Sequence, residues 1–428
     1  GQTVQVVPHV TDTIKDSIYK ASKEVKPDIQ IIEIGGTVGD IESLPFLEAI
    51  RQVKLEVGPM NAIFVHVTLL PYISTSHELK TKPTQHSVKN LMSLGIIPDF
   101  VVLRADRLIP DDYKIKVSKM CTLLKENVIS LPDLTNIYEV PLVLYHQKMD
   151  KIICDRFNIT KKINLKPWVK VISHYNELHE ETIIAVVGKY VELEDSYISV
   201  KEALKHAGLP LHCNVKVSFV NARELNETNY QEILKNYDGI LVPGGFGLSG
   251  IDGKLLAIKY ARENKVPFLG ICLGLQLAVI EYAQNVLKLE GANSTEFDPE
   301  TKYPIINYLP DQYTGINLGG TMRLGAYDCD IKEKTLAYEV YNSKKIKERH
   351  RHRYEFDNNY RLQFEEQGMT FSGINPQLNL VEIIELKDQP YYIASQFHPE
   401  FKSRPTKAHP LFYGLVKASI ANFKSKSK

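Results

Sequence analysis

The sequence predicts an α/β protein built from two domains, and three features support this prediction. Short apolar runs recur along the chain and alternate with longer amphipathic segments, as strands alternate with the helices that cover them. Hydrophobic residues make up 43% of the 428 residues, which is enough for two ordinary α/β cores. Several apolar runs also end in glycine-rich turns, where open α/β sheets bind their ligands.

The first domain is expected over residues 1–165. Two amphipathic stretches, Ser87–Leu94 and Ile115–Leu124, are predicted to be helices. This alternation is typical of a parallel sheet flanked by helices. The predicted strands are Ile29–Ile34, Ala62–Leu70, Phe100–Arg104 and Val128–Leu131.

A polar and charged segment, 166–181, is predicted to be a linker that contains a helix. The second domain is expected over residues 182–423 and begins with a buried strand, Thr182–Val187. The last residues, 424–428, alternate lysine with serine and are too polar to pack. We therefore expect them to form a disordered tail.

Charge and cysteine content narrow the class of protein. The formal net charge is +1, which gives no electrostatic reason to expect a nucleic-acid or membrane partner. The five cysteines form no C-x-x-C pair and no regular framework, so a reducing, cytoplasmic setting is expected. No apolar run reaches the roughly 18 residues that would indicate a membrane-spanning helix.

Cys272 lies in a Gly-Ile-Cys-Leu-Gly motif between an apolar run and a helix-like segment. At a sharp strand-to-helix turn the thiol is exposed at a helix N-terminus, where N–H dipoles favour the thiolate. A cysteine taken alone is more often inert and buried. Downstream, His398 and Glu400 stand two residues apart, which in an extended segment places both on one side. Together these residues supply a nucleophile, a base and an orienting acid.

A second glycine-rich loop, around Gly244 and Gly245, follows another apolar run. It is either an ordinary tight turn or an oxyanion hole built from backbone N–H groups. In the order loop, Cys, His, Glu, the carboxyl-terminal half resembles a class I glutamine amidotransferase domain. The resemblance implies that Cys272 forms a glutamyl thioester, that His398 shuttles the proton and that Glu400 orients His398. It also implies oxyanion donors at Gly244, Gly245 and Leu273, and glutamine-binding residues at Phe246, Gln276, Glu296 and Arg353.

Two motifs stand out in the amino-terminal half. Residues 34–43 read Ile-Gly-Gly-Thr-Val-Gly-Asp-Ile-Glu-Ser, and Glu33 before them is expected near the carboxyl end of a strand. Residues 80–87 read Lys-Thr-Lys-Pro-Thr-Gln-His-Ser, and their two ammonium groups suit a polyphosphate. Taken singly, the first motif is often only a turn, and lysines are usually solvated.

Combined with the stretches 319–325 and 348–355, these motifs make the chain similar to the CTP synthase family over essentially all of its length. The resemblance implies UTP, ATP and glutamine as substrates, magnesium as cofactor and a homodimer or homotetramer. It further implies that CTP inhibits by feedback and that GTP activates through a lid that includes 319–325. The residues implied are Glu33 as metal ligand; Asp40, Ile41, Glu42, Lys80, Lys82, Gln85 and Lys116 at nucleotides; and Glu42 and Arg51, beside Asp40, in the CTP pocket.

The sequence departs from this family in one respect. No Gly-x-x-x-x-Gly-Lys-Ser/Thr phosphate loop occurs in the 428 residues. The fold expected is therefore a truncated, P-loop-like amidoligase domain with a parallel sheet, followed by a class I glutamine amidotransferase domain. We expect the chain to lack synthetase activity and to keep its glutaminase. Two alternatives stay open, namely a stand-alone glutaminase with a nucleotide-binding domain and a non-catalytic scaffold of an oligomer.

Overall fold

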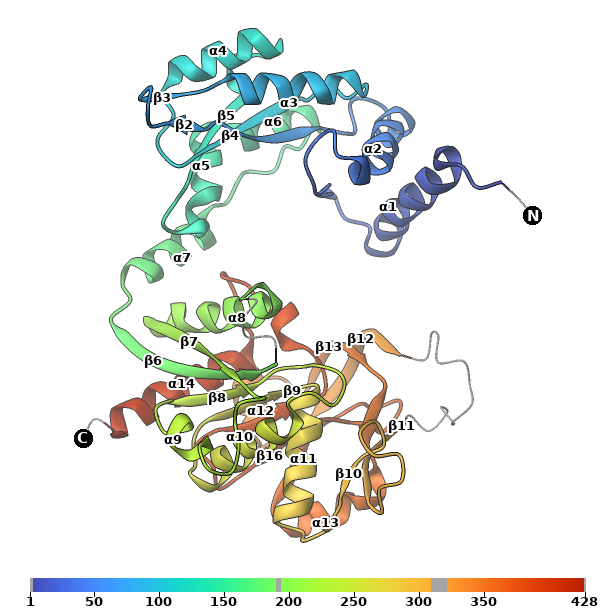
Figure 1. The fold of residues 1–428 in the computed structure, drawn as a ribbon, viewed down its shortest axis with the longest axis vertical. Coiled ribbons are helices and arrows are strands. Elements are labelled where there is room, and N and C mark those ends of the chain that lie inside the picture. The colour runs from blue at the N-terminus through green and yellow to red at the C-terminus, as the bar shows by residue number, and fades with distance from the viewer. Residues whose placement is uncertain (1–2, 190–193, 309–321, 427–428) are drawn as a thin grey trace. The chain divides into compact units, whose positions relative to one another are not determined.

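The computed structural model describes residues 3–189, 194–308 and 322–426. The chain forms two compact units, Gly1–Trp168 and Val169–Lys428, each of which has its own sheet and core (Figure 1). None of the helices in these described ranges is long and apolar enough to cross a membrane.

The first unit is built on a parallel sheet in the order β1-β4-β5. Val101 and Leu103 pack on one face with residues of α3 and α4, whereas Phe100 and Val102 pack on the other face with Met149 of α6. The sheet is thus covered by helices on both faces, as expected for an α/β layer. These elements are β1 (Val65–Leu69), β4 (Phe100–Ala105), β5 (Val128–Pro132), α3 (Lys82–Ser93), α4 (Asp111–Cys121) and α6 (Met149–Arg156).

Further elements of this unit surround the sheet. They are α1 (Thr11–Val25), α2 (Leu44–Val57), α5 (Val140–His146), the hairpin β2 (Tyr72–Ile73) and β3 (Glu78–Leu79), and the single turns η1 (Val6–Val10), η2 (Ile41–Ser43), η3 (Lys125–Asn127) and η4 (Ile137–Glu139). The sequence analysis did not separate these pieces, because most are too short to show a clear period.

The prediction of a strand at Ile29–Ile34 is wrong. These residues form no strand, and the Ile31 side chain is 92% exposed. A strand needs a neighbour that satisfies its backbone groups, and no described strand pairs with this segment. Glu33 is therefore an exposed loop residue here and does not end a strand.

The second unit contains a sheet of nine strands within the described residues, in the order β13-β12-β15-β16-β17-β9-β8-β6-β7. From β17 to β7 the neighbours are parallel, and from β13 to β17 they are antiparallel. The strands are β6 (Glu180–Gly188), β7 (Cys213–Asn221), β8 (Gly239–Val242), β9 (Phe268–Ile271), β12 (Arg323–Ile331), β13 (Lys345–His352), β15 (Met369–Ile374), β16 (Val381–Leu386) and β17 (Tyr392–Ser395).

Two apolar cores lie on the two faces of this sheet. One includes residues of α9, α10, α11 and α13, and the other includes residues of α8, α12 and α14 (Figure 1). A small sheet of β10 (Asn293–Ser294), β11 (Pro304–Tyr308) and β14 (Tyr354–Phe356) adjoins α11. The helices and turns are α8 (Ile198–Gly208), α9 (Tyr230–Leu234), α10 (Ile251–Glu263), α11 (Leu273–Asn285), α12 (Leu336–Tyr341), α13 (Arg361–Glu366), α14 (Pro410–Lys426), η5 (Glu194–Tyr197), η6 (Leu209–Leu211), η7 (Asn358–Tyr360) and η8 (Pro399–Phe401).

The segment between the units and the end of the chain differ in part from expectation. Helix α7 (Lys166–Asn176) lies within the predicted linker, and β6 begins two residues earlier than the strand predicted at Thr182. The tail predicted to be disordered is helical as far as Lys426, because Lys424 Nζ donates to Glu180 Oε1 at 2.8 Å and holds this turn on β6. Residues 427–428 lie outside the described part of the chain.

Candidate active site

The site is organised by two neighbouring parallel strands that end at the same edge of the sheet. Register places Ser395 of β17 beside Ile271 of β9, and the Cys272 N–H donates to the Ser395 carbonyl at 2.7 Å. The residues that follow the two strands, Cys272 and the segment 396–400, therefore meet although they are distant in sequence.

Cys272 occupies the predicted strand-to-helix turn, which the structure confirms. The expectation of an exposed thiol is wrong, because Cys272 packs within an apolar core of the second unit and is only 2% exposed. Its backbone has φ +51° and ψ −100°, and α11 starts at the next residue. This left-handed φ is uncommon for a residue with a side chain and is typical of functional sites. The turn is tight, because a Cβ on Gly274 would lie 2.3 Å from the Val242 carbonyl oxygen. Only glycine allows this approach of helix to strand.

His398 and Glu400 form a buried pair. His398 Nδ1 and Glu400 Oε1 are 2.7 Å apart, and both side chains are almost inaccessible to solvent. Burial by itself lowers the pKa of His398, but the interactions with Cys272 and Glu400 outweigh it and raise the pKa to about 10. The second ring nitrogen, Nε2, is buried and makes no hydrogen bond of ordinary geometry. The Cys272 thiol is nevertheless near enough to raise the pKa of the ring.

The loop after β8 lies directly against this pair. A Cβ on Gly244 would stand 2.8 Å from His398 Cε1 and 3.5 Å from Cys272 Cβ. A Cβ on Gly245 would lie 3.4 Å from Leu273 Cδ2. Leu273 is the first residue of α11, where helix N–H groups have no partner within the helix. The structure thus gathers the three predicted oxyanion donors around Cys272.

Of the predicted glutamine-binding residues, Phe246 and Glu296 lie at this loop, Arg353 lies near Glu296, and Gln276 lies between Tyr354 and Gln396. Gln276 Nε2 donates to the Tyr354 carbonyl at 3.1 Å, and Glu296 Oε1 accepts from the Gly247 N–H at 3.2 Å. Burial raises the pKa of Glu296, with Gly247 and Arg353 acting in the opposite direction. Phe246 is 48% exposed at the surface of the loop.

In the first unit, the structure brings together some of the predicted nucleotide residues. Lys80 forms an ion pair with Glu78, and both Lys80 and Lys116 lower the pKa of that carboxylate. Gln85 is buried and donates to Thr81 Oγ1 at 3.0 Å. Lys82 is the first residue of α3. Lys80 and Lys116 therefore share one neighbourhood, as a phosphate group would require.

The structure does not bring the predicted CTP and magnesium residues together in one described site. Asp40, Ile41 and Glu42 are exposed, and Arg51 donates to both carboxylate oxygens of Glu48, at 2.7 and 2.9 Å. No group of three or more His, Cys, Asp or Glu in the described residues is arranged to hold a metal ion. Glu33 alone does not supply the ligands of a magnesium site. Residues 319–321 of the predicted lid lie outside the described part of the chain.

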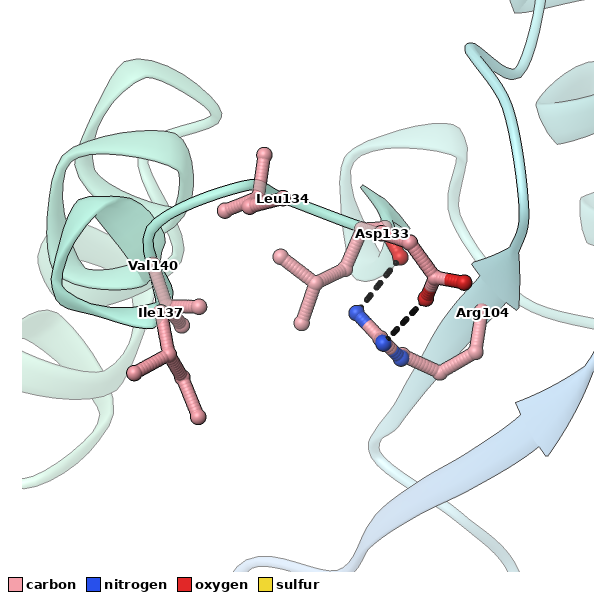
Figure 2. A pocket seen from close by; sticks show the side chains of 6 residues that line it. Arg104, Asp133, Leu134, Ile137 and Val140 are labelled. Atoms are coloured by element: carbon pink, nitrogen blue, oxygen red, sulfur yellow. Dashed lines mark hydrogen bonds and ion pairs between the residues drawn. The ribbon is translucent and has the colours of Figure 1, made fainter. Parts of the chain in front are cut away.

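Sequence reasoning missed a pocket of about 440 Å³ in the first unit. Arg104 Nη2 and Asp133 Oδ1 are 2.5 Å apart at one wall, Ile137 and Val140 lie opposite, and Leu134 lies between them (Figure 2). Arg104 is the next-to-last residue of β4 and Asp133 follows β5, so both stand at the carboxyl edge of the parallel sheet. A polar residue at each of these strand ends was the signal available in the sequence.

Comparison with known proteins agrees with this architecture. Residues 1–159 match the family described as CTP synthase N-terminus, and residues 192–418 match glutamine amidotransferase class-I. The CTP synthase of Bacillus subtilis (strain 168) is 54% identical over 421 residues, which are 98% of this chain and 79% of that protein. The CTP synthase of Clostridium beijerinckii is 53% identical over 427 residues, which are 100% of this chain and 80% of that protein.

A solved structure extends the agreement to three dimensions. The glutaminase domain of Trypanosoma brucei CTPS with bound acivicin has a TM-score of 0.53 and 34% sequence identity, covering 56% of this chain and 93% of that one. The predicted class, an α/β synthase domain followed by a class I glutamine amidotransferase domain, is confirmed. With both halves matched and more than half of its residues identical to these enzymes, the chain belongs to the CTP synthase family of glutamine-hydrolysing amidoligases.

Proposed function

We propose that Cys272 hydrolyses glutamine and that the ammonia released serves to convert UTP to CTP with ATP. One observation carries the first half of this proposal: the His398–Glu400 pair after β17 stands beside the Cys272 turn after β9. Family membership carries the second half. The test is to measure the glutamate formed from glutamine, and the CTP formed when UTP and ATP are also supplied.

The proposed reaction has two steps, in which Cys272 is the nucleophile and His398 transfers protons. The Cys272 thiolate attacks the amide carbon of glutamine and forms a C–S bond, while the carbonyl electrons move to oxygen and are stabilised by N–H groups of the Gly244–Gly245 loop and Leu273. His398, held by Glu400, gives its proton to the leaving nitrogen, and ammonia departs. Water then adds to the thioester, His398 takes its proton, and the C–S bond breaks to give glutamate.

The charge state of His398 supports this order of events. Because the pKa of His398 is raised to about 10, the imidazole carries its proton at neutral pH and is ready to donate it to nitrogen. The neighbouring Glu400 carboxylate stabilises the imidazolium form. Glutamine and its carboxylate are proposed to contact Gln276, Glu296, Phe246 and Arg353; of these, Glu296 accepts from the Gly247 N–H of the loop.

The first unit is proposed to bind the nucleotides. Lys80, Lys82 and Lys116 suit phosphate groups, with Gln85 and residues 40–42 as further contacts. The pocket of Figure 2 combines apolar walls with the Arg104–Asp133 pair, a combination suited to a flat base with polar edges. Magnesium dependence, GTP activation, a homodimeric or homotetrameric assembly and a cytoplasmic location are proposals that rest on family membership.

We expect the polypeptide of residues 1–428, by itself, to make no measurable CTP. Phosphoryl transfer depends on a phosphate-cradling loop with its Lys and on grouped metal ligands, and loss of one such donor costs about 100- to 1000-fold. The 428 residues include no such loop motif, and no group of three or more His, Cys, Asp or Glu among the described residues could hold a metal ion. Supplying UTP, ATP and free ammonia is the decisive assay because it bypasses Cys272.

CTP formation from ammonia would overturn that expectation and would favour a phosphate site built from other residues. Glutamine hydrolysis without ATP turnover would favour the alternative of a stand-alone glutaminase. If neither activity is present in the folded protein, the non-catalytic scaffold becomes the better interpretation.

Feedback by CTP provides a separate test of the first unit. If Glu42 and Arg51 contact CTP, then Glu42→Gln and Arg51→Ala should weaken CTP binding by about tenfold each, since a charged hydrogen bond is lost. Glu48→Gln is the matched control, because it frees Arg51 from its ion pair but keeps the guanidinium. Titration calorimetry with CTP measures the effect, and unchanged binding in both variants would remove these residues from the pocket.

A further inference from the structure

A buried chain of hydrogen bonds runs from a main-chain carbonyl to the nucleophile. Gln276 Nε2 donates to the Tyr354 carbonyl at 3.1 Å and lies 3.4 Å from Gln396 Oε1. Gln396 Nε2 in turn lies 3.8 Å from Cys272 Sγ, within the range of a hydrogen bond to sulfur. Gln396 is fully buried and the Gln276 side chain nearly so.

The orientation of the Gln276 and Gln396 amides follows from the Tyr354 carbonyl at which the series of hydrogen bonds begins. A carbonyl oxygen can only accept, so the Gln276 atom that faces Tyr354 must be the nitrogen. That nitrogen also faces Gln396, which must therefore present its oxygen to it. The opposite end of the Gln396 amide, facing Cys272, is then the NH₂ group. The donor at the sulfur is thus set by the surrounding network.

The backbone also fixes Gln396 at this place. It directly follows β17, and its N–H donates to the Glu382 carbonyl of β16 at 2.8 Å. Its preceding residue, Ser395, accepts from the Cys272 N–H at 2.7 Å. Two strand-end contacts therefore hold in register the backbones that carry the amide and the thiol.

We propose that Gln396 is a further catalytic residue, whose amide N–H donates to the Cys272 sulfur and stabilises it as the thiolate. The proposal rests on the proposed role of Cys272 as nucleophile. His398 gives up and regains a proton during the reaction, whereas an amide does not titrate in the physiological range. Gln396 therefore supplies a donor that persists when the C–S bond breaks and the electron pair returns to sulfur.

The test is the pH dependence of Cys272 alkylation by iodoacetamide, with the modified peptide identified by mass spectrometry. Gln396→Met removes the donor at similar volume, and Gln396→Asn keeps an amide but withdraws it from the sulfur. The free energy of a hydrogen bond to a charged group corresponds to about one to two pKa units. The midpoint of the alkylation profile should therefore move to higher pH by that amount in both variants. Glutamine turnover should fall about 10- to 100-fold in kcat with KM nearly unchanged, because the contact is to the reacting sulfur.

Gln389→Met is the matched control. Gln389 is a half-buried amide of the same unit that donates to the Arg262 carbonyl at 2.9 Å, and its loss should leave the alkylation profile unchanged. Gln396→Asn decides the question if Gln396→Met does not fold, as judged by circular dichroism. A parental alkylation profile in a folded Gln396 variant would overturn the proposal. Failure of Cys272 to react in the parent protein would instead overturn its role as nucleophile.

Discussion

Cys272→Ala is expected to abolish glutamine hydrolysis, with a loss of about a million-fold in kcat, as when the nucleophile of a catalytic triad is removed. No neighbouring thiol can replace it. Cys121 and Cys154 belong to the first unit, and burial raises the pKa of Cys213 and Cys329 of the second unit, that of Cys213 to about 12. Glutamate release by the purified variant is the measurement, and nucleotide binding by the first unit should be retained.

An electrophile that mimics glutamine provides the companion measurement. It should modify Cys272 and leave the other four cysteines unmodified, as read from labelled peptides. Cys213→Ala serves as the control variant, because it removes a buried thiol from the same unit. Residual glutaminase activity in Cys272→Ala, or preferential labelling of another cysteine, would contradict the assignment.

The turn at Cys272 and the His398–Glu400 pair could be predicted because short local patterns encode their geometry. A turn such as that of Cys272 requires glycine where Gly274 meets Val242, and this requirement is visible as Gly-x-Cys-x-Gly in the sequence. The His398–Glu400 pair is equally local, since only Pro399 separates its members. The residues of such motifs are close in sequence and therefore close in space, so they could be named without a structure.

Other features of the fold and the site depend on the pairing of strands that are distant in sequence, which no local pattern predicts. The register of β17 beside β9 places Gln396 at the sulfur, and the sequence gives no sign of this contact. The apolar run Ile29–Ile34 has the composition of a strand but finds no partner among the described strands, so composition alone was misleading. The pocket beside Arg104 and Asp133 likewise arises only when β4 and β5 pair.

Gly244→Ala is expected to lower kcat for glutamine hydrolysis by about 100-fold, as for misplacement of a catalytic group by about 1 Å. The new methyl group would stand 2.8 Å from His398 Cε1, closer than nonbonded carbons approach. His398 cannot easily yield, because its ring is tied to Glu400 at 2.7 Å and stacks on Phe401 with centroids 5.5 Å apart. Alanine keeps the backbone N–H, so the loss would arise from the displaced imidazole and not from a missing oxyanion donor.

Gly245→Ala is the informative comparison for this prediction. Its methyl group would meet Leu273 Cδ2 at 3.4 Å and Lys254 Nζ at 3.7 Å, both at ends of side chains that can shift. This variant also keeps its N–H and should therefore retain far more activity than Gly244→Ala. Steady-state glutaminase kinetics on both proteins, with thermal unfolding to verify the fold, separate the two effects. Equal activities would show that the close approach of Gly244 to His398 does not position the base, and that the loop acts through its N–H groups alone.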